Sequence, residues 1–133
     1  ISNLLNHKSG LIGITGLSSE MKDLMYWAEI PLDEPGYMPK IILSWPVDEK
    51  IKRAKLAIEV FINRIKKYIG SYYAILGGVD AIGFSGAIGS GSENIRNLIL
   101  SGLEHITKNA KIEVIDTDEE LEIAQEMINN INI

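Results

Sequence analysis

The longest regular pattern in this sequence runs from Asp48 to Leu76. Apolar residues recur along it at spacings of three and four, and lysine and arginine fill many of the remaining positions. No proline interrupts the run, which stops at Gly77-Gly78, and glycine commonly ends helices. We therefore predict a single helix of about 29 residues, roughly 43 Å long at 1.5 Å per residue.

Proline and tryptophan are confined to one part of the chain. All four prolines and both tryptophans lie between residues 27 and 46. The remainder contains no proline and can therefore run in long regular elements. We interpret the stretch at about residues 25–50 as a packed surface excursion, and a flap over a binding site is the alternative.

Shorter elements are predicted on both sides of the long helix. They are a strand or turn at residues 10–16 (GLIGITG), a helix across Glu20–Glu29 with Ser18 and Ser19 as N-caps, a buried strand at Val79–Ser85, a turn at Gly86–Ser92, a helix at Glu93–His105, a strand at Lys111–Asp116 and a closing helix at Thr117–Asn130. The order helix–strand–helix–strand–helix predicts a layered α/β unit with adjacent parallel strands. A length of 133 residues corresponds to about one domain.

Composition excludes several classes of protein. The absence of cysteine excludes disulfides, a zinc–thiolate site and a cysteine nucleophile. A net charge of −5 argues against nucleic acid or an anionic membrane as partner. No apolar stretch reaches the roughly 18 residues that span a bilayer, and no leader pattern is visible. We expect a soluble cytoplasmic protein. Because the sequence begins with Ile1 rather than methionine, we expect it to be processed or part of something longer.

The glycine-rich turn after the predicted buried strand is the strongest functional signal. Backbone N–H groups and the positive end of a helix dipole at such a turn attract phosphate. However, Gly86, Gly89 and Gly91 form a GxxGxG pattern, which is neither the dinucleotide fingerprint nor a P-loop. Phosphate binding and a plain strand-to-helix turn therefore both stay open. The functional hypothesis requires the amides between Phe84 and Glu93 to face a cleft that holds phosphate; with the resemblance described below, this would be the triphosphate of a purine nucleotide.

Three other polar features favour structural roles on pattern alone. The carboxylates of residues 117–120 (TDEE) suit Mg²⁺, but Thr117 and Glu120 also fit a capping box, which we favour. Residues 18–23 (SSEMKD) indicate a capped, solvated first helical turn. His7 and His105 are isolated, and we expect both to be surface or half-buried histidines.

Three segments together resemble a known family. They are LLNHKSGLIGITGLSSEMKDL (4–24), RAKLAIEVFINRIKKYIGSYYAILGGVDAIGFSGAIGSGS (53–92) and IEVIDTDEELEIAQ (112–125), which resemble the C-terminal half of acetate kinases, of the acetokinase family. The resemblance implies a partial actin-like ATPase domain of the ASKHA, ribonuclease H-like type. It implies the reversible transfer of a phosphoryl group from ATP to acetate, with Mg²⁺, to give acetyl phosphate and ADP. It also implies a homodimer formed largely through this portion.

The resemblance assigns site residues in three places. Glu20, Met21 and Lys22 match a family segment that lies against adenosine. Residues 87–91 (Ala87, Ile88, Gly89, Ser90 and Gly91) match the family's nucleotide loop. Glu119 matches the carboxylate assigned to Mg²⁺. No catalytic residue is carried over to this chain.

The sequence also departs from the family at these places. Lys22 replaces an arginine whose planar group stacks on a base better than an ammonium does. Glu20 replaces an aspartate, and Ser90 and Gly91 replace a glutamate and an asparagine. The stretch between Lys22 and Arg53 is longer than in the family, and the link from the helix at Glu93 to the strand at Lys111 is shorter.

The family's N-terminal half is absent from this sequence, including the groups that surround acetate and the transferred phosphoryl. Phosphoryl transfer depends on positioning and charge stabilisation, so we expect this chain alone not to turn over. The expected partners are that N-terminal half, and nucleotide and a short-chain carboxylate in the complete enzyme. One alternative is a non-catalytic dimerisation or binding module with a decayed nucleotide loop. Another is an unrelated α/β phosphate binder.

Overall fold

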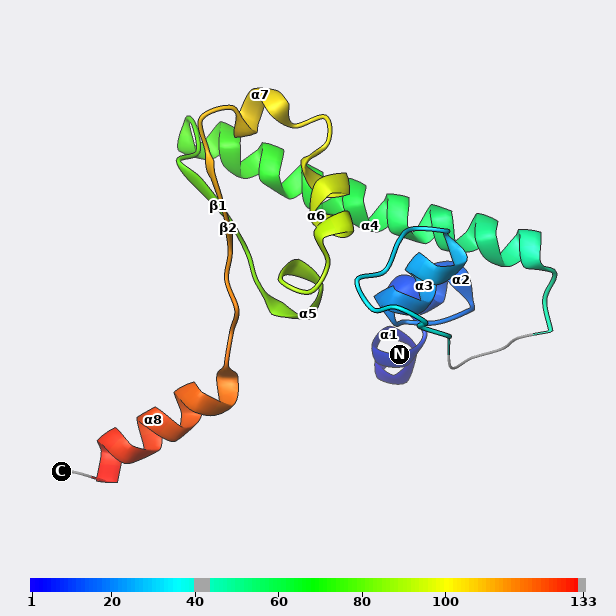
Figure 1. Cartoon of the computed structure of the whole chain (residues 1–133), viewed down its shortest axis with the longest axis horizontal. Helices are drawn as coiled ribbons and strands as arrows, with labels where there is room; N and C mark the ends of the chain where they lie inside the picture. Colours follow the sequence, from blue (N-terminus) through cyan, green and yellow to red (C-terminus); the bar gives the residue numbers. More distant parts are fainter. Residues whose placement is uncertain (40–43, 132–133) are drawn as a thin grey trace.

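The computed structural model describes residues 1–39 and 44–131, apart from the side chains of residues 119 and 131. The elements are α1 (Ser2–His7), α2 (Gly10–Thr15), α3 (Met21–Trp27), α4 (Val47–Leu76), β1 (Ala81–Phe84), α5 (Gly86–Gly89), α6 (Glu93–Leu100), α7 (Glu104–Thr107), β2 (Lys111–Val114) and α8 (Glu119–Ile131). Figure 1 shows α4 as the longest element. Helices α1–α3 lie near its N-terminal end, whereas α7 and the two strands lie near its C-terminal end. No helix within the described ranges is both long enough and apolar enough to cross a membrane.

Helix α4 confirms the prediction of one long helix. It ends at Gly77, whose φ of 72° places it in the left-handed region that glycine adopts without a steric penalty. Its apolar face is buried through Ala54, Ala57, Ile58 and Ile62. The two alanines have small side chains, so neighbouring helices can approach α4 closely.

Helices α3 and α6 both pack against α4 and form the core with it. Leu24 and Met25 of α3 are 0% and 1% exposed, and Ile95 of α6 is 0% exposed. Helix α3 is shorter than the predicted helix across Glu20–Glu29. The prediction of Ser18 and Ser19 as N-caps is wrong, because Glu20 takes the N-cap position and no side chain caps the helix. The Ser18 hydroxyl instead accepts the backbone N–H of Glu20 at 3.0 Å, just before the helix begins. The two segments that flank the candidate site therefore rest on one common helix.

The predicted parallel strand pair is confirmed, with Ala81 opposite Lys111 and Phe84 opposite Val114. The strands are shorter than predicted, and the prediction of a buried first strand is largely wrong, because only Phe84 of β1 is buried. The predicted layering is also incomplete. Helix α8 extends away from the strands (Figure 1), and its side chains from Glu120 to Asn130 are exposed. A two-stranded sheet offers little apolar surface for a helix to cover.

Residues 10–16 form helix α2 and not the predicted strand or turn. Leu11 and Ile14, three residues apart, face the core from this helix. Thr15 is buried, and its hydroxyl donates to the carbonyl of Leu11 at 2.9 Å. Gly16 then ends the helix with a φ of 63°. The alternating glycines suggested a period of two, but packing against α4 selects the helical period.

The predicted helix at Glu93–His105 is interrupted. It divides into α6 and α7, separated by a turn in which Gly102 has a φ of 79°. After this turn the chain forms α7, which leads into β2 near the C-terminal end of α4 (Figure 1).

The described part of the 25–50 excursion is packed, as expected. The Lys50 ammonium lies 4.5 Å from the centre of a Trp27 ring, and the Arg53 guanidinium lies 4.7 Å from the centre of a Trp45 ring. Such cation–aromatic contacts hold the excursion against the start of α4. Residues 40–43 of this stretch lie outside the described residues.

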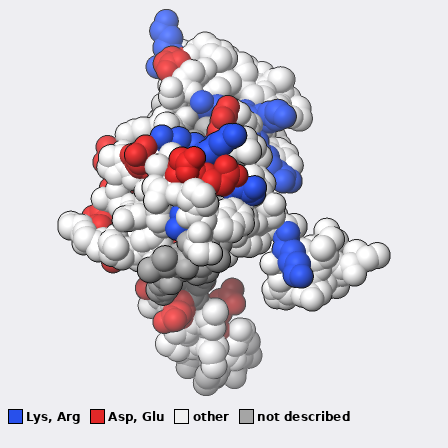
Figure 2. Space-filling view, turned by 90° about the vertical axis from the view of Figure 1, so that its right-hand side faces the viewer, with Lys and Arg blue, Asp and Glu red and all other residues white. Residues whose placement is uncertain are grey.

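Acidic and basic side chains are intermingled on the face shown in Figure 2. Exposed ion pairs in the described part of the chain join Lys22 to Glu34, Arg53 to Glu49, Lys55 to Glu29 and Lys111 to Glu113. Pairs this exposed contribute at most about 1 kcal/mol each to stability. The fold therefore depends on its core, and such pairs matter mainly where they fix a side chain beside a site.

Candidate functional site

Two segments far apart in the sequence meet around one hollow of about 270 Å³. One is the segment that starts α3, and the other is the glycine loop that follows β1. The lining consists of Ser19, Glu20, Met21, Lys22, Met25, Ala87, Ile88, Gly91 and Ser92. The hollow thus brings together six of the eight nucleotide-site residues expected from the sequence. Gly89 and Ser90 belong to the same loop but do not line it.

The glycine loop follows its path because glycine occupies its tightest positions. Gly86 leaves β1 with a φ of 70°, and α5 begins there. A Cβ atom on Gly91 would lie 2.3 Å from the carbonyl oxygen of Ala87, a distance that no side chain tolerates. The backbone at Gly91 therefore passes against α5 in a way that only glycine permits.

Arg96 fastens the carbonyl side of this loop. One of its guanidinium nitrogens donates to the carbonyl oxygens of Gly89 at 2.9 Å and Ser90 at 2.8 Å. Ser92 fixes the loop's other end, because its hydroxyl caps α6 by accepting the N–H of Ile95 at 3.3 Å. The Ser90 hydroxyl donates to the carbonyl of Gly86 at 3.0 Å. The loop is therefore held in one shape by its own neighbours.

Arg96 was not among the site residues predicted from the sequence. A signal was available, because an arginine one turn into the helix after a glycine loop can reach back to the loop carbonyls. His7 and His105 are exposed and lie outside the hollow, which agrees with the prediction that both are surface or half-buried histidines.

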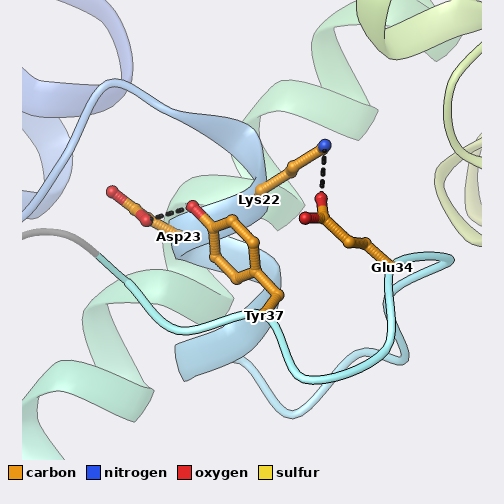
Figure 3. Close-up of polar contacts among 4 residues, drawn as sticks. All are labelled: Lys22, Asp23, Glu34 and Tyr37. Atoms are coloured by element: carbon orange, nitrogen blue, oxygen red, sulfur yellow. Dashed lines mark hydrogen bonds and ion pairs between the residues drawn. The ribbon is translucent and has the colours of Figure 1, made fainter.

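The other wall of the hollow depends on a buried carboxylate at Asp23. Its two oxygens accept the hydroxyls of Ser18 and Tyr37, each at 2.6 Å. Figure 3 shows Tyr37 reaching from the loop after α3 to Asp23, while the neighbouring Lys22 points to Glu34. Asp23 is only 3% exposed, and Ser18 and Met21 are also buried, so the interpretation of residues 18–23 as a solvated turn is wrong for these three residues. Its partner Tyr37 is distant in sequence, and no local pattern indicates the contact.

The Tyr37–Asp23 hydrogen bond predicts a loss of stability at high pH. The hydrogen bond to the carboxylate, aided by burial, raises the pKa of Tyr37 from 10.0 to about 12. A folded-state pKa above the unfolded value means that the contribution to stability is complete below pH 10 and is lost as the pH rises toward 12. Urea unfolding of Tyr37→Phe should show less loss of stability over this range than the original chain. Tyr68→Phe, at an exposed position, is the control and should follow the original chain. Parallel curves for all three proteins would contradict the assignment.

The start of α8 leaves the sheet at the same edge as the glycine loop, since Val114 pairs with Phe84. The capping role favoured for this segment is present, although the cap is Asp118, which accepts the N–H of Leu121 at 2.9 Å, and not the predicted pair Thr117 and Glu120. The side chain of Glu119, the proposed Mg²⁺ ligand, lies outside the described residues. Within the described ranges, no group of three or more His, Asp or Glu side chains is arranged to hold a metal ion.

Comparison with known proteins gives one consistent result. The sequence profile of the Acetokinase family matches residues 40–108. The acetate kinase of Dictyoglomus thermophilum is 38% identical over 149 aligned residues, which cover 96% of this chain and 33% of that protein. The chain thus spans about a third of the length of the curated relatives it matches.

Solved structures agree with the sequence matches. The crystal structure of Porphyromonas gingivalis acetate kinase superposes with a TM-score of 0.72 at 26% identity, over 96% of this chain and 33% of that one. A propionate kinase from Francisella tularensis gives a TM-score of 0.68 at 34% identity, over 94% of this chain and 32% of that one. The chain is thus a mixed α/β fragment whose architecture matches part of these kinases.

Proposed function

This chain belongs to the acetokinase family, and from that premise we propose that it is the C-terminal, ATP- and Mg²⁺-binding portion of an acetate kinase. The complete enzyme would transfer a phosphoryl group reversibly between ATP and acetate. We place that enzyme in the cytoplasm and expect it to dimerise through this portion. The observation that carries the proposal is the hollow shared by the α3 start and the glycine loop.

The walls of the hollow suit a nucleoside. Ala87 and Ile88 offer apolar surface for a flat base, and the largely buried Met21 and Met25 form the apolar wall opposite them. Methionine adapts well to an aromatic ring. Glu20 and Lys22 lie at its edge and supply polar groups. The loop from Ala87 to Gly91, held by Arg96, then fixes the backbone along which the rest of the nucleotide would lie.

The acidic segment after β2 is compatible with Mg²⁺. This ion needs only one or two carboxylates, with water and phosphate oxygens completing its shell. Glu119 is our proposed ligand, beside Asp118, whose side chain is used in capping α8. When bound, Mg²⁺ would offset the negative charge of the phosphates.

The role of this chain in the reaction is to bind and orient the nucleotide. The relatives are about three times as long as the region matched here, and phosphoryl transfer requires groups on both sides of the transferred phosphoryl. We propose that the 133 residues bind MgATP without turning over, and that acetate and the transferred group are held by other parts of the complete enzyme.

Titration with MgATP tests this function. We expect saturable stabilisation that requires Mg²⁺, because a ligand that binds only the folded state stabilises it by about 2.7 kcal/mol at 100 times its Kd. Thermal unfolding and calorimetry measure this effect, and a coupled assay for acetyl phosphate should stay at background. The control without nucleotide, MgCl₂ alone, should leave the unfolding curve unchanged. Sustained turnover by the isolated chain would contradict the division of roles.

A second candidate is a non-catalytic binding or dimerisation module derived from the family. The observation in its favour is that the Ser90 hydroxyl bonds within the loop to Gly86, while Gly91 has no side chain. Gly91 therefore offers no side-chain hydrogen bond to a ligand, and the Ser90 hydroxyl can no longer donate one. The same titration separates the candidates, since this module would show no response to millimolar MgATP.

A further inference from the structure

A second hollow, of about 210 Å³, continues the candidate nucleotide site on one side. It is lined by Lys22, Met25, Leu32, Asp33, Glu34, Gly91 and Ser92. Four of these, namely Lys22, Met25, Gly91 and Ser92, also line the first hollow, so the two form one groove. The outer wall of the added part comes from residues 31–37, here named the strap. The strap lies outside the residues that the family profile matches.

The strap is fixed to both elements that flank the groove. At its start, the side-chain amide of Asn94 on α6 donates to the carbonyl of Pro31 at 3.1 Å. At its end, Tyr37 donates to Asp23 on α3. Between these points Leu32 packs against the core, and Glu34 holds the Lys22 ammonium at 2.9 Å (Figure 3). These contacts hold the strap in place, so it forms a fixed wall of the groove.

The chemistry of this wall differs from that of the first hollow. Ionised carboxylates accept hydrogen bonds but cannot donate them. The side chains of Asp33 and Glu34 carry two negative charges, and the ammonium of Lys22 balances only one of them. Among the described residues, the Asp33 side chain makes no hydrogen bond or ion pair, whereas Glu34 is paired with Lys22. A ligand group that lies here must donate hydrogen bonds, and a phosphate group would be repelled.

We propose that the strap determines which end of a nucleotide this part of the groove accepts. Asp33 and Glu34 accept hydrogen bonds from the nucleoside end, either the exocyclic amine of the base or the ribose hydroxyls, and direct the phosphates to the opposite end. Glu34 also positions Lys22 along the wall. This proposal rests on the proposed function, because it concerns the same site.

The test measures nucleoside affinity by calorimetry on the whole chain. The double substitution Asp33→Asn with Glu34→Gln should weaken adenosine binding by about threefold to tenfold, because the neutral amides still accept hydrogen bonds but lack the charge that strengthens them. Glu29→Gln is the matched control, because it breaks the similarly exposed pair with Lys55 away from the groove. The control should bind adenosine as the original chain does. Unfolding curves verify that all variants fold, as expected for exposed positions.

Two further ligands identify the donor. If Asp33 and Glu34 accept hydrogen bonds from the exocyclic amine, the original chain should bind inosine more weakly than adenosine. The difference between the two affinities should then be smaller in the double variant. If these carboxylates accept hydrogen bonds from the ribose hydroxyls, 3′-deoxyadenosine and 2′-deoxyadenosine should bind more weakly than adenosine instead. Adenosine affinity unchanged in the double variant would overturn the strap's role while leaving the proposed function intact. No binding of adenosine or MgATP by the original chain would overturn both.

Discussion

Replacing Gly91 with alanine should weaken nucleotide binding by about tenfold or more and destabilise the fold by about 1–3 kcal/mol. The new Cβ would lie 2.3 Å from the carbonyl oxygen of Ala87, which is backbone and cannot rotate away. Arg96 also holds the carbonyls of Gly89 and Ser90, so the strain cannot relax without breaking these bonds. Calorimetric titration with MgATP and urea unfolding measure the two effects.

Gly70→Ala is the matched control for this prediction. Gly70 lies within α4, and a Cβ there would meet no atom within 4 Å. Alanine at this position should stabilise the chain by roughly 0.5–1 kcal/mol, because glycine costs that much in a helix interior. Nucleotide affinity should be unchanged. A Gly91→Ala variant as stable as the Gly70→Ala variant would show that the loop does not have the tight path described above.

Replacing Leu24 with alanine should destabilise the chain by about 2–5 kcal/mol, the range observed for buried leucine. Leu24 is fully buried in α3, within the core that joins α3 and α6 to α4. For a chain of this size the loss is a large part of the whole free energy of unfolding. Urea unfolding followed by circular dichroism measures it.

The control is the same substitution on the outside of α4. Leu56 is 50% exposed, so Leu56→Ala should change the unfolding free energy by no more than about 1 kcal/mol. Helix α3 and its N-cap place Glu20, Met21 and Lys22 in the site. Weaker packing of α3 in Leu24→Ala should therefore also weaken nucleotide binding. Equal costs for the two leucines would mean that α3 does not depend on its contact with α4.

The regular elements of the fold were largely predictable because their signals are local. Spacings of three and four predicted α4 to within one residue of its start, and Gly77 marked its end. The strands around Ile82 and Ile112 and their parallel pairing followed from the order of elements. The prediction was wrong where local signals were ambiguous, as with the glycines of α2, or where one glycine divided a helix, as at Gly102.

The residues of the candidate site were also only partly predictable from the sequence. Glu20, Met21, Lys22 and the loop from Ala87 to Gly91 were selected from sequence, since glycine patterns and the family resemblance lie within short segments. The side chains that support them were not. Arg96, Asp23 and Tyr37 act through partners elsewhere in the chain or on backbone atoms, and such contacts leave no periodic or compositional trace.

The sequence by itself therefore determined the long helix, the strand order, the position of the glycine loop and the family. Each of these depends on neighbours within a few residues or on short motifs. Only the tertiary structure decided that α3 and the glycine loop share one hollow, that Asp23 is buried beneath Tyr37, and that residues 31–37 close one side of the groove. The physical reason is that burial and hydrogen bonding between distant residues depend on packing against α4, which no short stretch of sequence specifies.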